Sequence, residues 1–374
     1  MDYVGILNKL INDIRSLPIN CALAAVSGGV DSTTSAVIVR RAIGDKLRAV
    51  FLDTGFMRNN EPNYIKSILS GVLPIDIIDV HERFYREMLG IGDAEEKRVR
   101  FREVFYTTLS GIAKELGCDW LVQGTIAPDW IETRGGIKTQ HNVLEQVGID
   151  TVSKYGFKLL EPLREFYKDQ VREIAKYLGV PDEIINRQPF PGPGLSIRAV
   201  GTLTLEKLDV VRRATEIVER RLGGLGLSQW FAAAWEYETS RDEEITRSLR
   251  HFGELSVELF KVRATGIKGD ARSYGHVALI RGELMRWDIV YMLYDQVTSN
   301  YDVTHVIYEL ASRGRGEYFV SIRAVVTDDF MTADVPRLPR DLLMEVAGEI
   351  LEDDRVAGVG YDVTPKPPAT IEYE

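Results

Sequence analysis

The sequence is poor in residues that bind metals or form disulfides. Only two cysteines, Cys21 and Cys118, occur among 374 residues, together with five histidines. The cysteines do not form a C-x-x-C pair and have no histidine cluster nearby, so neither a zinc site nor a disulfide framework is expected. Cys21 begins an apolar run, residues 21–26, which favours a buried structural thiol over a reactive one. So few candidates also leave no convincing Cys–His–Glu nucleophilic triad.

Long apolar runs are absent as well. No stretch of about 18 apolar residues occurs, so the sequence predicts no transmembrane helix. Residues 1–17 alternate polar and apolar side chains at helical spacing, without the basic start and apolar centre of a signal peptide. We therefore expect a cytoplasmic protein that does not associate with membranes.

Positive charge is scarce relative to negative charge. The formal net charge is -10, which argues against a general nucleic-acid-binding protein because such proteins replace phosphate counterions with a basic surface. Any anionic substrate must then be held by local glycine loops, lysines, arginines or bound Mg²⁺. The apolar content of 45% fits a globular protein with a substantial core, and the length favours two domains.

The first half of the chain alternates strand-like and helix-like segments. This alternation predicts an α/β domain in which helices cover both faces of a parallel sheet, with ligands at the carboxyl ends of the strands. The polar, irregular segment 125–150 interrupts the pattern, and we interpret it as a lid. The expected strands are 21–26, 47–53, 75–80 and 119–123, and the expected helices are 31–43, a stretch ending near 70, 98–116 and 167–178.

The second half begins after a proline- and glycine-rich loop, residues 189–194. We place the domain boundary near Gly201, giving domains 1–200 and 201–374, the second being a smaller α+β domain. Within it, residues 276–281 resemble 318–323, and each is followed by a helical stretch and a valine-rich strand. We interpret this as two strand–helix–strand units side by side, with chance similarity between apolar strands as the alternative.

The strongest local signal is a glycine- and hydroxyl-rich loop directly after the first buried strand. Two glycines allow backbone N–H groups to face an anion, and the following helix N-terminus adds partial positive charge. Asp31 would repel phosphate unless a cation lay between them, which indicates Mg²⁺. The alternative is an ordinary glycine turn with serine caps. The loop consists of Ser27, Gly28, Gly29, Val30, Asp31, Ser32 and Thr33.

This loop lacks the lysine of a Walker A motif and does not match G-x-G-x-x-G. It resembles the PP-loop, S-G-G-x-D-S, of the ATP-pyrophosphatase superfamily. The resemblance implies an adenine-nucleotide alpha-hydrolase-like fold and cleavage of ATP to AMP and pyrophosphate, with the substrate becoming an adenylate.

Further segments resemble the GMP synthase family, and the resemblance extends from about residue 20 to residue 374. It implies a ligase that adenylates XMP with ATP and aminates the product with ammonia to give GMP. The segments are residues 95–98 (Glu-Glu-Lys-Arg), 124–132 (Gly-Thr-Ile-Ala-Pro-Asp-Trp-Ile-Glu), 187–195 (Arg-Gln-Pro-Phe-Pro-Gly-Pro-Gly-Leu), 269–274, 328–333 and 366–374 (Lys-Pro-Pro-Ala-Thr-Ile-Glu-Tyr-Glu).

The same resemblance implies roles for individual residues. Asp31 would bind Mg²⁺ and act in catalysis together with Lys138 and His141 of the lid. Leu52 and Gly124 would join the Ser27–Thr33 loop in binding ATP. The residues implied for XMP are Arg98, Asn142, Arg187, Asp270, Lys366, Ile371 and Glu372.

The family resemblance also bears on partners. Because the PP-loop begins at residue 27, there is no room before it for the glutaminase domain of single-chain relatives. We expect ammonia to be taken up free or supplied by a separate glutaminase subunit, and the second domain to form a homodimer. The alternatives are another PP-loop ligase such as NAD synthetase, a tRNA thiolase, and a non-catalytic nucleotide sensor. A thiolase would need reactive cysteines and a basic surface, and the intact loop argues against a sensor.

Overall fold

The computed structural model describes residues 2–129, 150–269, 271–282, 286–328 and 330–374. The chain forms two compact units. The first comprises Met1–Glu87 and Arg98–Gly192, and the second comprises Met88–Lys97 and Pro193–Glu374. The division at residue 192 lies inside the proline-rich loop, whereas the sequence placed the boundary near Gly201. With residues 88–97 the second unit is about as long as the first, although we expected it to be smaller.

The first unit is built on a parallel sheet, as the alternating pattern predicted. Within the described residues its strand order is β3-β2-β1-β4-β5. The chain therefore adds β2 and β3 on one side of β1, and then adds β4 and β5 on the other side. The switch point between β1 and β4 is where open α/β sheets bind ligands. The strands are β1 (Ala22–Ala25), β2 (Leu47–Asp53), β3 (Asp76–Asp79), β4 (Trp120–Val122) and β5 (Lys158–Leu160).

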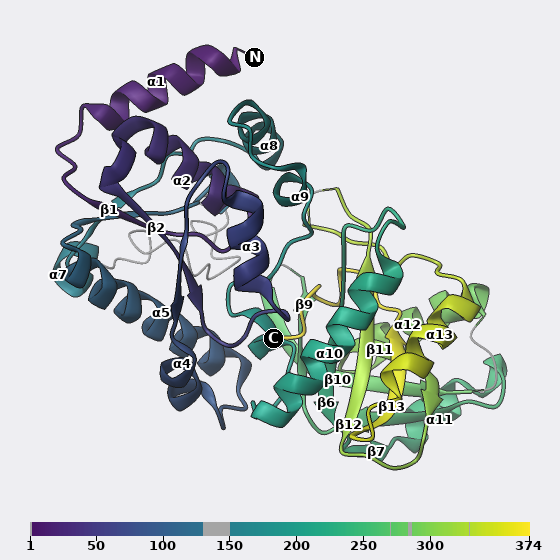
Figure 1. Cartoon of the computed structure of the whole chain (residues 1–374). Coiled ribbons are helices and arrows are strands. Elements are labelled where there is room, and N and C mark those ends of the chain that lie inside the picture. Colours follow the sequence, from purple (N-terminus) through teal and green to yellow (C-terminus); the bar gives the residue numbers. More distant parts are fainter. Residues whose placement is uncertain (1, 130–149, 270, 283–285, 329) are drawn as a thin grey trace. The chain divides into compact units, whose positions relative to one another are not determined.

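Helices cover both faces of this sheet (Figure 1). One apolar cluster joins the sheet to α1, α2, α3 and α8, and it contains Ile38, Ile65 and Ile174. A second cluster joins the opposite face to α5 and contains Leu23, Tyr106 and Leu109. The helices are α1 (Tyr3–Arg15), α2 (Val30–Ile43), α3 (Glu61–Leu69), α4 (His81–Met88), α5 (Ala94–Leu116), α7 (Thr151–Tyr155), α8 (Lys168–Tyr177) and α9 (Asp182–Ile185).

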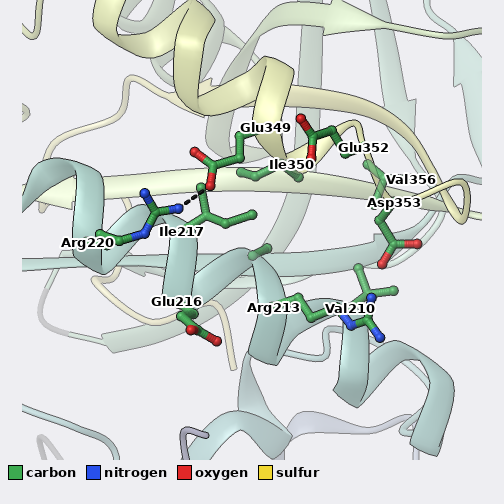
Figure 2. Close-up of a pocket in the computed structure, with 11 residues that line it drawn as sticks. Val210, Arg213, Glu216, Ile217, Arg220, Glu349, Ile350, Glu352, Asp353 and Val356 are labelled. Atoms are coloured by element: carbon green, nitrogen blue, oxygen red, sulfur yellow. Dashed lines mark hydrogen bonds and ion pairs between the residues drawn. The ribbon is translucent and has the colours of Figure 1, made fainter.

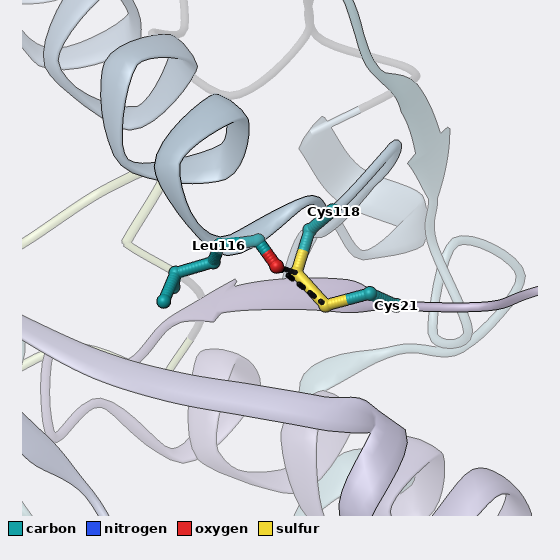
Figure 3. The surroundings of a disulfide bond; sticks show 3 residues. All are labelled: Cys21, Leu116 and Cys118. Carbon is teal, nitrogen blue, oxygen red and sulfur yellow. Dashed lines mark hydrogen bonds between the residues drawn. A yellow bond between two sulfur atoms is a disulfide. The ribbon is translucent and has the colours of Figure 1, made fainter.

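Cys21 and Cys118 form a disulfide, so the expectation that the sequence contains no disulfide was wrong (Figure 3). Cys21 directly precedes β1 and Cys118 lies two residues before β4. These strands are parallel neighbours, with Ala22 opposite Trp120, so the residues before them lie side by side. The two Cα atoms are 4.4 Å apart. Sequence spacing could not show this pairing because it depends on strand order.

We expect the disulfide to stabilise the first unit appreciably. It closes a loop with a sequence separation of 97 residues, and such cross-links typically contribute about 2–4 kcal/mol, mainly by restricting the unfolded chain. Reduction with dithiothreitol should lower the free energy of unfolding in urea by that amount. The matched control is the Cys21→Ala/Cys118→Ala variant, whose unfolding should not respond to reductant. An unchanged unfolding midpoint of the reduced wild-type chain would contradict the prediction.

The second unit contains the predicted internal repeat. Its described strands form a sheet of order β6-β12-β13-β11-β10-β8-β7, with β9 pairing β10. In one repeat β10 runs parallel to β11, with His276 opposite Val303; in the other β12 runs parallel to β13, with Tyr318 opposite Val356. Both pairs have a register shift immediately after these residues. The shared irregularity confirms two equivalent strand–helix–strand units, joined where β11 and β13 pair antiparallel.

The remaining elements of the second unit extend this framework. Helix α10 packs on β6, and α12 and α13 lie on β11. The strands are β6 (Gln229–Glu236), β7 (Thr239–Arg241), β8 (Ser256–Phe260), β9 (Ala264–Lys268), β10 (Ala271–Arg281), β11 (Val303–Ser312), β12 (Tyr318–Val325) and β13 (Val356–Asp362). The helices are α10 (Leu205–Leu222), α11 (Glu243–Ser248), α12 (Trp287–Asn300) and α13 (Arg340–Ile350), with short 3₁₀ turns at Gly194–Ile197 and Arg250–Phe252. A further 3₁₀ turn, Gly44–Lys46, follows α2 in the first unit.

The C-terminal segment, residues 364–374, contributes side chains to the second unit's core. Tyr373 is fully buried and packs edge-on against Trp235, with ring centroids 4.9 Å apart. The backbone N–H of Thr265 donates to the Tyr373 carbonyl at 2.8 Å. Arg323, also fully buried, donates to the carbonyls of Thr364 and Thr370. The segment therefore belongs to the fold and is not a loose tail.

A buried ionic cluster lies beneath this segment. Asp362 accepts from His305 at 2.7 Å and pairs with Arg323 at 3.2 Å, and all three side chains are fully buried. Burial alone would raise the pKa of Asp362, but the charges of Arg323 and His305 outweigh it and hold the pKa at about 2. Asp362 is therefore ionised wherever the fold is intact at ordinary pH.

This cluster predicts acid sensitivity. The folded-state pKa of Asp362 lies below its ordinary value of 3.8, so at pH values between the two the unfolded chain binds more protons than the folded chain. The resulting stability, about 2 kcal/mol, is present above pH 4 and lost as the pH falls toward 2. Asp362→Asn should have a lower free energy of unfolding than wild type above pH 4. As the pH falls toward 2, however, its free energy of unfolding in urea should decrease by about 2 kcal/mol less than that of wild type. Equal acid sensitivity of the two proteins would refute the assignment.

Candidate functional site

The predicted phosphate loop lies at the switch point of the first sheet, between β1 and α2. Gly28 has a φ of +79°, a conformation that side chains other than glycine rarely adopt, and it turns the chain toward the helix. The hydroxyls of Ser27 and Ser32 lie 3.2 Å apart and close the loop on itself. Gly29 is the N-cap of α2, so the helix begins inside the motif and directs its first N–H groups into the loop.

Gly124 supports the loop from the neighbouring strand. It follows β4, and a Cβ built on it would lie 2.6 Å from the backbone nitrogen of Ser32 and 2.7 Å from the carbonyl carbon of Asp31. Any larger residue would therefore displace the start of α2. The structure thus places Gly124 against the phosphate loop, where the sequence had assigned it to ATP.

Asp31 presents a carboxylate suited to a cation. Its Oδ2 pairs with the Lys168 Nζ at 2.5 Å, while Oδ1 is buried and has no hydrogen-bond partner among the described residues. A buried carboxylate oxygen without a donor is costly unless a cation or a proton satisfies it. Asp31 therefore fits the Mg²⁺ expected with ATP. Lys168 was not identified from the sequence.

Three further residues predicted for the site, Leu52, Arg98 and Arg187, lie in the first unit and differ in burial and contacts. Leu52 lies in β2 with its side chain buried in the core on the α5 side. Arg98 lies on α5 and is partly buried. Arg187 follows α9, donates to Glu61 at 2.6 Å and approaches Gly28, where a built Cβ would lie 2.9 Å from its guanidinium. Arg187 therefore borders the phosphate loop.

Four predicted residues lie outside the described part of the chain: Lys138, His141, Asn142 and Asp270, as does most of the segment 125–150 interpreted as a lid. Elsewhere, in the described ranges, no three His, Cys, Asp or Glu side chains gather closely enough to hold a metal ion. Nor does any described helix combine the length and apolarity needed to cross a membrane.

The predicted nucleotide residues of the second unit that the structure describes, Lys366, Ile371 and Glu372, each contact neighbouring residues. Lys366 donates to the Phe330 carbonyl at 2.5 Å. Ile371 is 8% exposed and packs in the core. Glu372 accepts two hydrogen bonds from the buried Arg198, at 2.8 and 3.1 Å. Their assignment to XMP stays a prediction.

A groove of about 490 Å³ lies between α10 and α13 of the second unit (Figure 2). Its charged side chains pair with one another: Arg220 contacts Glu349, and Arg213 contacts the nearby Asp209 at 3.1 Å. Opposite charges that are already paired offer an anion no excess positive charge. The groove therefore lacks the features of the phosphate loop.

Comparison with known proteins agrees with this geometry. Residues 293–373 match the family described as GMP synthase C terminal domain. The chain is 52% identical to a subunit of the glutamine-hydrolyzing GMP synthase of Saccharolobus solfataricus, over 94% of each chain. It is 39% identical to the subunit of the same name from Archaeoglobus fulgidus, over the full length of both. The solved structure of NMN synthetase from Francisella tularensis has a TM-score of 0.40 and 18% identity, covering 56% of this chain and 85% of that one. This chain belongs to the family of GMP synthase synthetase subunits and is an ATP-using ligase.

Proposed function

We propose that this chain converts XMP, ATP and ammonia into GMP, AMP and pyrophosphate, with Mg²⁺ bound at Asp31. The observation that carries the proposal is the phosphate loop, which combines a glycine turn, a helix N-terminus and a carboxylate with one unsatisfied oxygen at the sheet's switch point. Relatives named as a GMP synthase subunit support the choice of substrate.

The reaction divides into two displacements. The C2 oxygen of XMP attacks the α-phosphorus, and the bond to the β-phosphate breaks with its electron pair leaving on pyrophosphate. Ammonia then adds to C2 and loses a proton, and AMP departs with the C2 oxygen. The loop N–H groups and the N-terminus of α2 would hold the leaving pyrophosphate, and Mg²⁺ would neutralise part of its charge. The chain's task is mainly positioning and charge neutralisation.

One coupled assay tests this proposal. Continuous formation of AMP should require XMP, ATP, Mg²⁺ and ammonium together, and the AMP and pyrophosphate released over many turnovers should equal the GMP produced. Pyrophosphate release that is independent of XMP, or that requires a different acceptor, would overturn it.

Ammonia is expected to come from a separate glutaminase subunit, consistent with the relatives' names, which make each of them one subunit of a glutamine-hydrolyzing enzyme. With ammonium rigorously removed, glutamine alone should give no GMP. Adding a glutaminase should restore synthesis, whereas GMP made from glutamine by this chain alone would refute the expectation.

The homodimer also belongs to this proposal. The sheet of the second unit ends at β6 on one side and β7 on the other, and Met292 of α12 is 50% exposed. Exposed apolar side chains and strand edges are surfaces that a second copy covers. Light scattering at micromolar concentration should give twice the mass of one chain; a monomer would disprove it.

A further inference from the structure

One buried side chain holds both ends of a loop that carries Lys366. The loop consists of residues 364–370, and the side chain is that of Arg323 in β12, which is fully buried. Its Nη1 donates to the Thr364 carbonyl at 2.6 Å, and its Nη2 donates to the Thr370 carbonyl at 3.0 Å. Because a guanidinium is planar and rigid, these two hydrogen bonds fix the distance between the first and the last residue of the loop.

The ionic cluster around Asp362 holds Arg323 in turn. Asp362 Oδ1 lies 3.2 Å from Arg323 Nη1 and also accepts from the Thr364 N–H at 3.0 Å. The other carboxylate oxygen lies 2.7 Å from His305 Nδ1. The side chains of Arg323, Asp362 and His305 are all closed to water, so moving the guanidinium would leave buried charges without partners, which is strongly unfavourable. Arg323 is therefore a fixed point for the loop.

The backbone of Lys366 is also paired with a neighbouring segment of the second unit. The Lys366 N–H donates to the Ala333 carbonyl at 2.8 Å, and the Ala333 N–H donates to the Lys366 carbonyl at 3.0 Å. The Lys366 Nζ donates to the Phe330 carbonyl at 2.5 Å. A lysine side chain is a flexible four-carbon stem, so its ammonium is placed accurately only where the backbone that carries it is fixed. The contacts of the loop with Arg323 and Ala333 fix that backbone.

We propose that Arg323 is a positioning residue for XMP, because its bridge between the carbonyls of Thr364 and Thr370 sets the loop so that the Lys366 ammonium meets the XMP phosphate. This inference rests on the proposed function, in which Lys366 binds XMP. Arg323 is fully buried and acts on the substrate only through the loop. A displacement of about 1 Å in a site can cost about 100-fold in rate, so a small shift of this loop has a large effect.

The test begins with Arg323→Lys, which keeps the positive charge beside Asp362 but lacks the planar fork that reaches two carbonyls. Steady-state kinetics should give a Michaelis constant for XMP raised about 10- to 100-fold and one for ATP within about twofold of wild type. The decisive measurement is the same substitution in a Lys366→Met background. There it should raise the Michaelis constant for XMP less than about twofold, because the group that Arg323 positions is gone.

Two further variants separate positioning from a loss of stability. Leu343→Ala empties a fully buried position on α13, in the same unit but outside the apolar cluster that contains Ala333. It should lower the unfolding midpoint in urea and leave both Michaelis constants within about twofold of wild type. Asp362→Asn keeps both donors of Arg323 but removes the charge that holds it, so it should raise the Michaelis constant for XMP alone. This variant gives the answer if Arg323→Lys does not fold.

The outcomes separate this inference from the proposed function. A folded Arg323→Lys protein with the wild-type Michaelis constant for XMP would overturn the inference while leaving the proposed function in place. Equal increases for XMP and ATP would also overturn it, because they indicate a general loss of structure. An undiminished effect of Arg323→Lys in the Lys366→Met background would show that Arg323 does not act through Lys366. If wild type itself made no GMP from XMP, both the proposed function and this inference would fail.

Discussion

Asp31→Asn is expected to keep its fold and to lose XMP-dependent pyrophosphate release by at least about 100-fold. The Asp31–Lys168 pair is partly exposed, with side chains 26% and 39% accessible, so losing it should cost less than about 1 kcal/mol of stability. Neutralising the carboxylate, by contrast, removes the anionic ligand that would hold Mg²⁺ against the phosphates, and metal-ion charge stabilisation is typically worth several kcal/mol.

Activity and binding should be measured together for this variant. Titration with Mg²⁺ should show weaker ATP binding and a higher metal requirement. The matched control is Asp169→Asn, which removes an exposed carboxylate beside Lys168 on α8 and should leave turnover within about twofold of wild type. Wild-type turnover of Asp31→Asn at ordinary Mg²⁺ would remove Asp31 from the site.

Much of the fold could be predicted because its signals are local. Strand and helix alternation gave the parallel sheet, and the apolar strands 276–281 and 318–323 gave the repeat. Strand β6 was not predicted, since its central alanines, Ala232–Ala234, favour helix. Pairing with β12 over residues 229–236 decides the conformation, and small side chains there let α10 pack closely.

The site residues could likewise be predicted only where their signal is local in the sequence. The loop Ser27–Thr33 could be found because strand, glycines and helix are contiguous. Lys168 and Glu61 could not, because the fold brings them to the loop from distant segments. One signal was available for Lys168: a lysine at the first position of a helix opposes the helix dipole, which indicates that an anion lies nearby. The Cys21–Cys118 pair depended on strand order in the same sense.

The second large effect concerns residues 371–374. Deleting them should lower the free energy of unfolding of the second unit by about 5 kcal/mol or more. Removing a buried aromatic such as Tyr373 typically costs about 3–5 kcal/mol. The deletion also removes Glu374, whose carboxylate accepts from the fully buried Lys97 at 2.5 Å and from the Gly201 N–H at 2.7 Å. A longer truncation, after Thr364, also removes these residues and would therefore lower stability as well as affect XMP binding.

Point variants separate the two effects. Glu374→Gln leaves the Lys97 ammonium buried without a counter-charge, beside the carbonyls of Ser196 and Ala199, and should cost about 3–5 kcal/mol in urea unfolding. The Lys97→Met/Glu374→Gln variant should recover most of that loss, because no uncompensated charge remains.

Lys366→Met leaves this pair intact and tests XMP binding by itself. It should raise the Michaelis constant for XMP about 10- to 150-fold and leave the Michaelis constant for ATP within about twofold of wild type. An unchanged XMP constant in Lys366→Met would take Lys366 out of the nucleotide site, and a Glu374→Gln protein as stable as wild type would show that the buried pair does not hold the segment in place.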